Sequence, residues 1–343
     1  MGIATDLPGY VLAKYDMQIE DIETIKDGET QNNYWRIKSA DSVYLLWKYQ
    51  GDLGLLQEVL EWRELLAEKG YMEFPLLYKT KSGKNFVQEE QNGYFVTLCS
   101  PERYAYFSPE KSSGFIKVVD ALSRLNTATK NLAVIKDKQT ERPEKVAVYW
   151  LTAYQEKLNK LLCFYRYLQE KRLANDFERL FVENFEGFYE RGQQAIQRMV
   201  LASSSLEESE EAGFLIGNFL PKNMLETETG MIFLNMANYP KGLPIHDLSL
   251  FLKMYLPLQK WDAEFALKLL TRYQEKVALA NQEKHLFLAL LSFPGRFCTY
   301  TQQYWQGTGD NISELAINLI NYLCEIYWQD RCLERLEKSL WGE

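Results

Sequence analysis

Residues 213–234 have the sequence GFLIGNFLPKNMLETETGMIFL, in which strand-like runs surround a polar turn. The runs are rich in aromatic and aliphatic side chains. They cover 213–219, 224–225 and 231–234. The polar turn covers 226–230 and ends in Gly230. Because helical patterns lie on both sides of this stretch, we predict a lone hairpin around 214–235 within a helical region.

The helical patterns around the hairpin consist of Leu, Phe and Tyr repeating every three or four residues. They predict helices over 145–170, 177–200, 262–276, 282–291 and 312–338. A further helix is predicted to start near Ser108, because Ser is a favoured N-cap and Pro109 fits the first helical position. Residues 99–343 are therefore expected to form one mainly helical lobe.

The first hundred residues have a different character, with short β-branched and aromatic runs. The predicted strands are 33–38, 42–49, 76–80, 85–88 and 94–98. One helix is predicted over 54–69, ending at Gly70. The fold class is therefore α+β, with residues 1–98 forming an antiparallel sheet with one helix packed on it.

Composition excludes several classes of function. The net charge of −8 has the wrong sign for a protein that binds nucleic acid through a broad basic face. The five cysteines are odd in number and form no CxxC pair, so we expect them to be reduced. Only two histidines are present, which argues against a histidine-based metal site. No signal peptide or membrane span is expected, since no uncharged apolar stretch reaches roughly 18 residues.

Three motifs carry a resemblance to a known family. They are LPIHDL at 243–248, SFPGRF at 292–297 followed by Tyr304-Trp305, and LSRLNTATK at 122–130. Together they resemble the spore coat protein S (CotS-like) family of the aminoglycoside phosphotransferase-like superfamily, over about residues 20–338. The resemblance implies a bilobal, protein-kinase-like fold.

The superfamily's catalytic loop has the pattern HGDxxxxN, and an IDF motif follows it. This chain has Asn218 where the catalytic Asp is expected, Asn223 at the metal-binding Asn, and Asn235 at the metal-binding Asp. Mg²⁺ is usually held by one or two carboxylates together with the phosphates, and phosphoryl transfer depends on charge neutralisation. The resemblance therefore implies a pseudokinase. We expect no cofactor, with ATP and Mg²⁺ as weak ligands at most.

Other positions are assigned from the same resemblance. Lys48 lies where the superfamily has its phosphate-pairing lysine, and Glu58, or Glu61, could be its helix partner, although both types are also ordinary solvated residues. The phosphate-covering turn at 28–33 has a single glycine. Asp247 is expected to cap backbone amides of the catalytic loop, a structural role, and His246 beside it to be packed and hydrogen-bonded.

The expected function is that of a non-catalytic kinase-fold protein that acts by binding. The resemblance implies a component or assembly factor of the bacterial spore coat, found in the mother-cell cytoplasm and then in the coat, with other coat proteins as partners. A small-molecule substrate is not favoured. Two alternatives stay open, namely a phosphotransferase acting on a small hydroxylated substrate and a nucleotide-binding scaffold without turnover.

Overall fold

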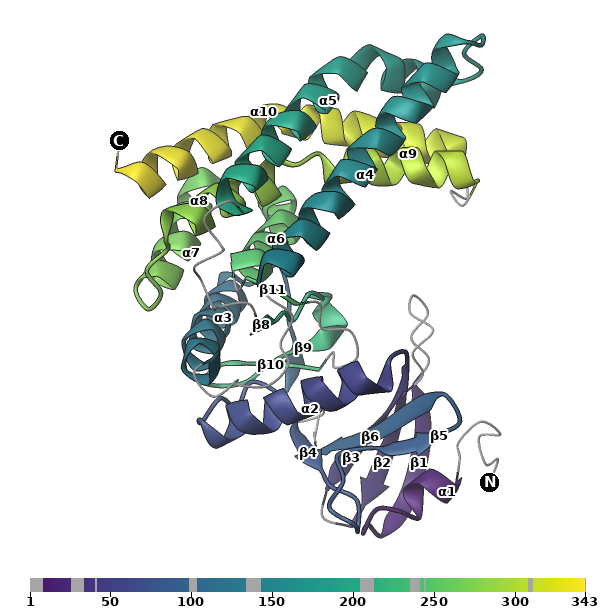
Figure 1. Ribbon diagram of the computed structural model, residues 1–343, viewed down its shortest axis with the longest axis vertical. Coiled ribbons are helices and arrows are strands. Elements are labelled where there is room, and N and C mark those ends of the chain that lie inside the picture. Colours follow the sequence, from purple (N-terminus) through teal and green to yellow (C-terminus); the bar gives the residue numbers. More distant parts are fainter. Residues whose placement is uncertain are drawn as a thin grey trace. The chain divides into compact units, whose positions relative to one another are not determined.

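The computed structural model describes residues 9–25, 34–40, 42–98, 104–133, 143–203, 213–234, 241–243, 245–307 and 311–342 (Figure 1). The chain divides into two compact units. Unit 1 consists of Met1–Val134 with Asn218–Pro240, and unit 2 of Ile135–Gly217 with Lys241–Glu343. The predicted lobes, residues 1–98 and 99–343, stay a prediction, because a division into compact units does not test a division into lobes.

The main sheet of unit 1 has the strand order β1-β2-β3-β6-β4, with β5 also paired to β6, and every pairing is antiparallel. The strands are β1 (Ile19–Ile25), β2 (Tyr34–Ser39), β3 (Val43–Gln50), β4 (Leu76–Tyr78), β5 (Val87–Glu89) and β6 (Asn92–Leu98). The five predicted strands are confirmed within the described residues. β1 was not predicted, because its sequence IEDIETI is charged and largely exposed.

Each face of this sheet is covered by a different helix. On one face, α1 (Gly9–Leu12) joins a buried cluster that contains Trp35, Leu46 and Val96. On the other face lies α2 (Leu53–Glu68), which confirms the helix predicted over 54–69. A Cβ atom at Gly93 of β6 would lie 2.4 Å from Leu56 of α2, so the absent side chain lets the helix approach the sheet closely.

The predicted hairpin is confirmed, but its description as a lone hairpin within a helical region is wrong, because a third strand pairs with it and it belongs to unit 1. It consists of β9 (Met224–Glu226) and β10 (Met231–Phe233), and β7 (Ala105–Tyr106) pairs with β9 to complete a small sheet. The helix α3 (Ser112–Ala133) packs beside it, and Lys117 donates to Glu226 Oε1 at 2.9 Å. The predicted helix start at Ser108 is wrong, because Lys111 N donates to Ser108 O at 3.1 Å in a turn before the helix begins.

Unit 2 is mainly helical, and β8 (Gly213–Phe214) pairs with β11 (Lys241–Gly242). Its helices are α4 (Pro143–Gln169), α5 (Asp176–Ser203), α6 (Ile245–Tyr255), α7 (Ala263–Gln274), α8 (Asn281–Ser292), α9 (Gly295–Gln306) and α10 (Ile312–Trp341). All five helices predicted in this region are confirmed. Stacked rings fill the core, with Phe297 centred 4.2 Å from Phe188 and 5.1 Å from Phe181.

Candidate functional site

The loop that follows β8 is held by a buried carboxylate from unit 2. Asp247 lies in the first turn of α6 and is 2% exposed. Its two oxygens accept hydrogen bonds from Ile216 N and Gly217 N, both at 2.9 Å. Gly217 has φ +65°, a conformation that favours glycine. Asp247 therefore fixes the backbone of the loop, which is a structural role.

Burial sets the protonation of Asp247 and its neighbour. It raises the pKa of Asp247 to about 7, although the bonds from Gly217 and Ile216 counteract this effect. It lowers the pKa of His246 to about 4, against the raising effect of the hydrogen bond to Leu243. His246 is 4% exposed, and its ring lies 4.9 Å from that of Trp150. The histidine is packed and hydrogen-bonded, as predicted, and carries no charge at neutral pH.

Asn218 and Asn223 both lie in the segment that joins this loop to the hairpin. Asn218 is half-buried, and its Oδ1 accepts from Leu220 N at 3.2 Å, so the side chain binds its own loop. Asn223 ends a short 3-10 helix, η3 (Pro221–Asn223), and its carbonyl accepts from Leu234 N at 2.8 Å. Asn235 lies outside the described residues. The roles that the resemblance implies for the three asparagines stay predictions.

Strand register places Lys48 on the face of the sheet opposite α2. Gly93 faces α2 and lies directly across from Tyr49, so Tyr49 faces α2 as well. Side chains alternate along a strand, which puts Trp47 on the α2 face and Lys48 on the other, across from Tyr94. An ion pair between a strand lysine and a helix glutamate needs both side chains on one face. The structure therefore does not bring Lys48 toward α2.

The two candidate glutamates lie on α2 itself. Glu58 is exposed, and Glu61 accepts a hydrogen bond from Gln57. Within the described part of the chain, no hydrogen bond or ion pair joins Lys48 to another residue. A binding role for Lys48 stays a prediction.

Trp47 is one of the residues that β3 directs toward α2, and its surroundings are aromatic. The indole Nε1 donates to Thr97 Oγ1 at 3.0 Å, and the ring lies 4.8 Å from that of Tyr34 and 6.3 Å from that of Phe95. The side chain is 8% exposed. The sequence did not reveal this position, because Leu45, Leu46 and Trp47 are all apolar and leave the phase of the strand ambiguous.

These residues do not fit an ATP–Mg²⁺ group. Of the described positions of the catalytic motif, Asn218 offers a neutral amide where the pattern has a carboxylate, whereas Asn223 keeps the amide that the pattern has there. Glu226, a carboxylate on the hairpin, is already paired with Lys117 at 2.9 Å. Among the residues that the structure describes, no group of three or more His, Cys, Asp and Glu side chains could hold a metal ion. No described helix is long and apolar enough to cross a bilayer.

Comparisons with known proteins agree with the predicted resemblance. The profile of a family described as "Spore coat putative kinase YutH" matches residues 11–335. Spore coat protein S of Bacillus subtilis (strain 168) is 21% identical over 301 residues, which cover 86% of this chain and 83% of that protein.

Solved structures show the fold. An aminoglycoside phosphotransferase from Alicyclobacillus acidocaldarius superposes with a TM-score of 0.81 at 14% identity, covering 100% of this chain and 98% of the other. Amicoumacin kinase hAmiN, in complex with AMP-PNP and Ca²⁺, superposes with a TM-score of 0.56 at 14% identity, covering 94% and 91%. The predicted α+β, protein-kinase-like fold is confirmed.

Proposed function

The chain belongs to the spore coat YutH family of putative kinases, and we propose that it is a non-catalytic member that acts by binding. The observation that carries this proposal is the position of Trp47. A buried, uncharged indole occupies the position next to Lys48 that faces α2, and a lysine would need to be on this face to pair with a helix glutamate and with phosphate. A pseudokinase site is the simplest account of this replacement.

The catalytic loop supports the same proposal. Phosphoryl transfer needs little covalent chemistry from the protein, and the rate comes from positioning and from neutralising charge. Asn218 cannot accept a proton from a substrate hydroxyl as a carboxylate would, and its oxygen is already bound to Leu220 N. Among the described residues, a lysine on the face of β3 toward α2 and a carboxylate at position 218 are thus both absent, although the chemistry would require them.

The biological setting follows from the family. We propose that the protein is a structural or assembly component of the bacterial spore coat, made in the mother-cell cytoplasm and then incorporated in the coat, with other coat proteins as its partners. The family description and the similarity to spore coat protein S support this setting. ATP and Mg²⁺ are not required for such a role.

Thermal unfolding with and without nucleotide tests the proposal. A ligand at 100 times its dissociation constant stabilises the folded state by roughly 2.7 kcal/mol. We expect millimolar ATP, with Mg²⁺ or Mn²⁺, to leave the melting temperature unchanged, whereas an active aminoglycoside phosphotransferase measured in parallel should be stabilised. A metal-dependent rise in melting temperature would instead favour the two alternatives that bind nucleotide, namely a phosphotransferase for a small hydroxylated substrate, which the enzymes of the same fold suggest, and a scaffold without turnover.

A further inference from the structure

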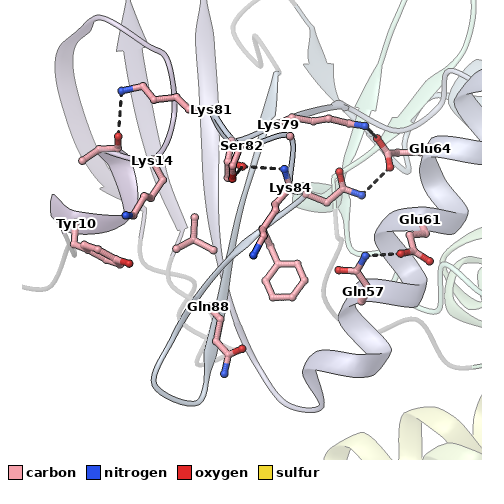
Figure 2. Close-up of a pocket in the computed structure, with 16 residues that line it drawn as sticks. Tyr10, Lys14, Gln57, Glu61, Glu64, Lys79, Lys81, Ser82, Lys84 and Gln88 are labelled. Atoms are coloured by element: carbon pink, nitrogen blue, oxygen red, sulfur yellow. Dashed lines mark hydrogen bonds and ion pairs between the residues drawn. The ribbon is translucent and has the colours of Figure 1, made fainter.

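A pocket of about 840 Å³ opens at the edge of the main sheet of unit 1. The strands β4 and β5 both pair with β6, and the chain leaves the sheet between them over residues 79–86. This excursion, together with α1 and α2, lines the pocket (Figure 2). The volume lies within the range of about 300–1,000 Å³ that is typical of small-molecule sites.

The lining is basic although the chain is acidic. Four lysines line the pocket, namely Lys14, Lys79, Lys81 and Lys84, against the two glutamates Glu61 and Glu64. Four positive charges less two negative charges leave a local charge of +2, on a chain whose net charge is −8. A concave surface of one sign concentrates ligands of the other sign. The pocket is therefore suited to a compact dianion.

The four lysines differ in the partners that they already have within the protein. Lys79 forms an ion pair with Glu64 at 2.6 Å, and Lys81 donates to the carbonyl of Ala13 at 3.2 Å. Lys14 lies 4.4 Å from the ring centre of Tyr10. Lys84 has no side-chain partner within the described part of the chain. Lys14, Lys81 and Lys84 thus face no carboxylate partner among the described residues.

The turn that contains Lys81 and Lys84 is ordered by its own hydrogen bonds. Thr80 N donates to Lys84 O at 2.9 Å, and Lys84 N donates to Thr80 Oγ1 at 2.9 Å. Gly83 has φ +78°, which the turn requires and a side chain would disfavour. Lys81 N donates to Lys14 O at 2.8 Å and fastens the turn to the segment after α1. The pocket is consequently held in place without a ligand.

A buried amide in the wall gives an independent indication of a ligand. Asn85 is 8% exposed and lines the pocket, and its Nδ2 donates to Glu64 Oε2 at 2.7 Å. The carboxylate of Glu64 can only accept, so the atom of Asn85 that contacts it must be the nitrogen. Oδ1 is then the remaining acceptor of the amide. This oxygen has no hydrogen-bond partner among the described residues. Buried polar atoms are nearly always paired, and a donor that reaches this oxygen from the pocket would supply the missing partner.

We propose that this pocket binds a small organic phosphate that carries hydroxyl groups. The phosphate monoester supplies about two negative charges and three acceptor oxygens for the ammonium groups of Lys84 and Lys14. A hydroxyl of the same molecule donates to Asn85 Oδ1. This site is separate from the residues that carry the proposed function, and its occupancy does not depend on whether the protein is a pseudokinase.

Calorimetric titration of the full chain tests the proposal, with glucose 6-phosphate, glucose and inorganic phosphate as probes. We expect glucose 6-phosphate to bind and glucose not to bind, with affinity falling as the salt concentration rises. Lys84→Gln should weaken glucose 6-phosphate about tenfold, since it removes one charged hydrogen bond. The matched control Lys111→Gln removes an exposed positive charge outside the pocket and should change nothing.

Asn85→Ala separates the hydroxyl contact from the charge. It should weaken glucose 6-phosphate while leaving inorganic phosphate unchanged, and thermal unfolding of each variant checks that the fold is kept. If Lys84→Gln leaves binding unchanged, or if Lys111→Gln lowers it equally, the attraction is diffuse and the proposal is wrong. Absence of binding by both phosphates would overturn it as well.

Discussion

Asp247 Oδ1 lies 2.9 Å from Gly217 N, and this hydrogen bond fixes the residue directly before Asn218. The second oxygen of the same carboxylate holds Ile216 N at the same distance. Asp247 thus supports the loop that leads to position 218, where the resemblance implies a catalytic Asp and this chain has Asn. A binding protein that kept the fold would keep the carboxylate that supports this loop and lack the catalytic one.

Asp247→Asn should destabilise the protein by about 1–3 kcal/mol at pH 8, because the amide nitrogen cannot accept and one buried N–H loses its partner. Urea unfolding gives this difference. The matched control is Asp52→Asn at the N-cap of α2, where the exposed carboxylate also accepts from two backbone amides. Asn is as good an N-cap as Asp, so the control should change stability by less than about 0.5 kcal/mol. Equal losses in the two variants would contradict the role of Asp247.

His246 makes stability depend on pH in a defined direction. Burial lowers its pKa to about 4 in the folded protein, whereas an unfolded histidine has a value near 6.5. Between these values the unfolded chain binds more protons, so the contribution of His246 is present above about pH 6.5 and is lost as the pH falls toward 4. The stability gap between the wild type and His246→Asn should therefore narrow over that range in urea unfolding. A constant or widening gap would show that the histidine is not held neutral.

Gly93→Ala tests on which face of the sheet α2 lies. The added Cβ atom would approach Leu56 to 2.4 Å and Leu53 to 3.1 Å, so we expect a loss of about 1–3 kcal/mol from overpacking. Gly187→Ala in α5 is the control, since its Cβ atom would meet nothing within 4 Å and alanine favours the helix by roughly 0.5–1 kcal/mol. If Gly93→Ala were neutral, α2 would not cover this face, and Lys48 could no longer be assigned to the opposite one.

The double change Asn218→Asp with Asn235→Asp should restore metal-dependent ATP binding before it restores transfer. A carboxylate at 235 supplies charge directly to the ion, whereas transfer also needs an acceptor held in line with the phosphate. The affinity should stay low, because Trp47 still occupies the position that faces α2. Calorimetry with ATP and Mg²⁺ measures the gain, with Asn218→Ala and Asn235→Ala combined as the control. No gain in the double variant would mean that more than these two residues prevents binding.

The sequence predicted the elements whose patterns are local and strong. The hairpin of β9 and β10 and the long amphipathic helices are of this kind, because their apolar spacing is preserved over many residues. The strand β1 and the helix α6 are harder. β1 is an exposed edge with few apolar side chains, and α6 begins directly after Pro244 within a segment recognised only as a motif.

A residue of the candidate site could be predicted from the sequence where a motif identifies it. It could not be predicted where the answer depends on which face of the sheet a strand residue points to. Asp247 follows from the LPIHDL motif, and its contacts in the structure are with the loop that the motif implies. Lys48 lies between two residues that face α2, and only the register across from Gly93 shows that it faces the other way. The lysine pocket was not predicted, because three distant segments contribute to it.

The central claim, that the protein binds without transferring phosphate, is tested most directly by incubating it with labelled ATP, Mg²⁺ or Mn²⁺ and a panel of sugars and amines. Our account predicts no labelled product above the level of a heat-denatured sample, because the described catalytic loop has an amide at Asn218 and β3 directs an indole toward α2. Labelled product that forms with the wild type and disappears with Asn218→Ala would contradict it.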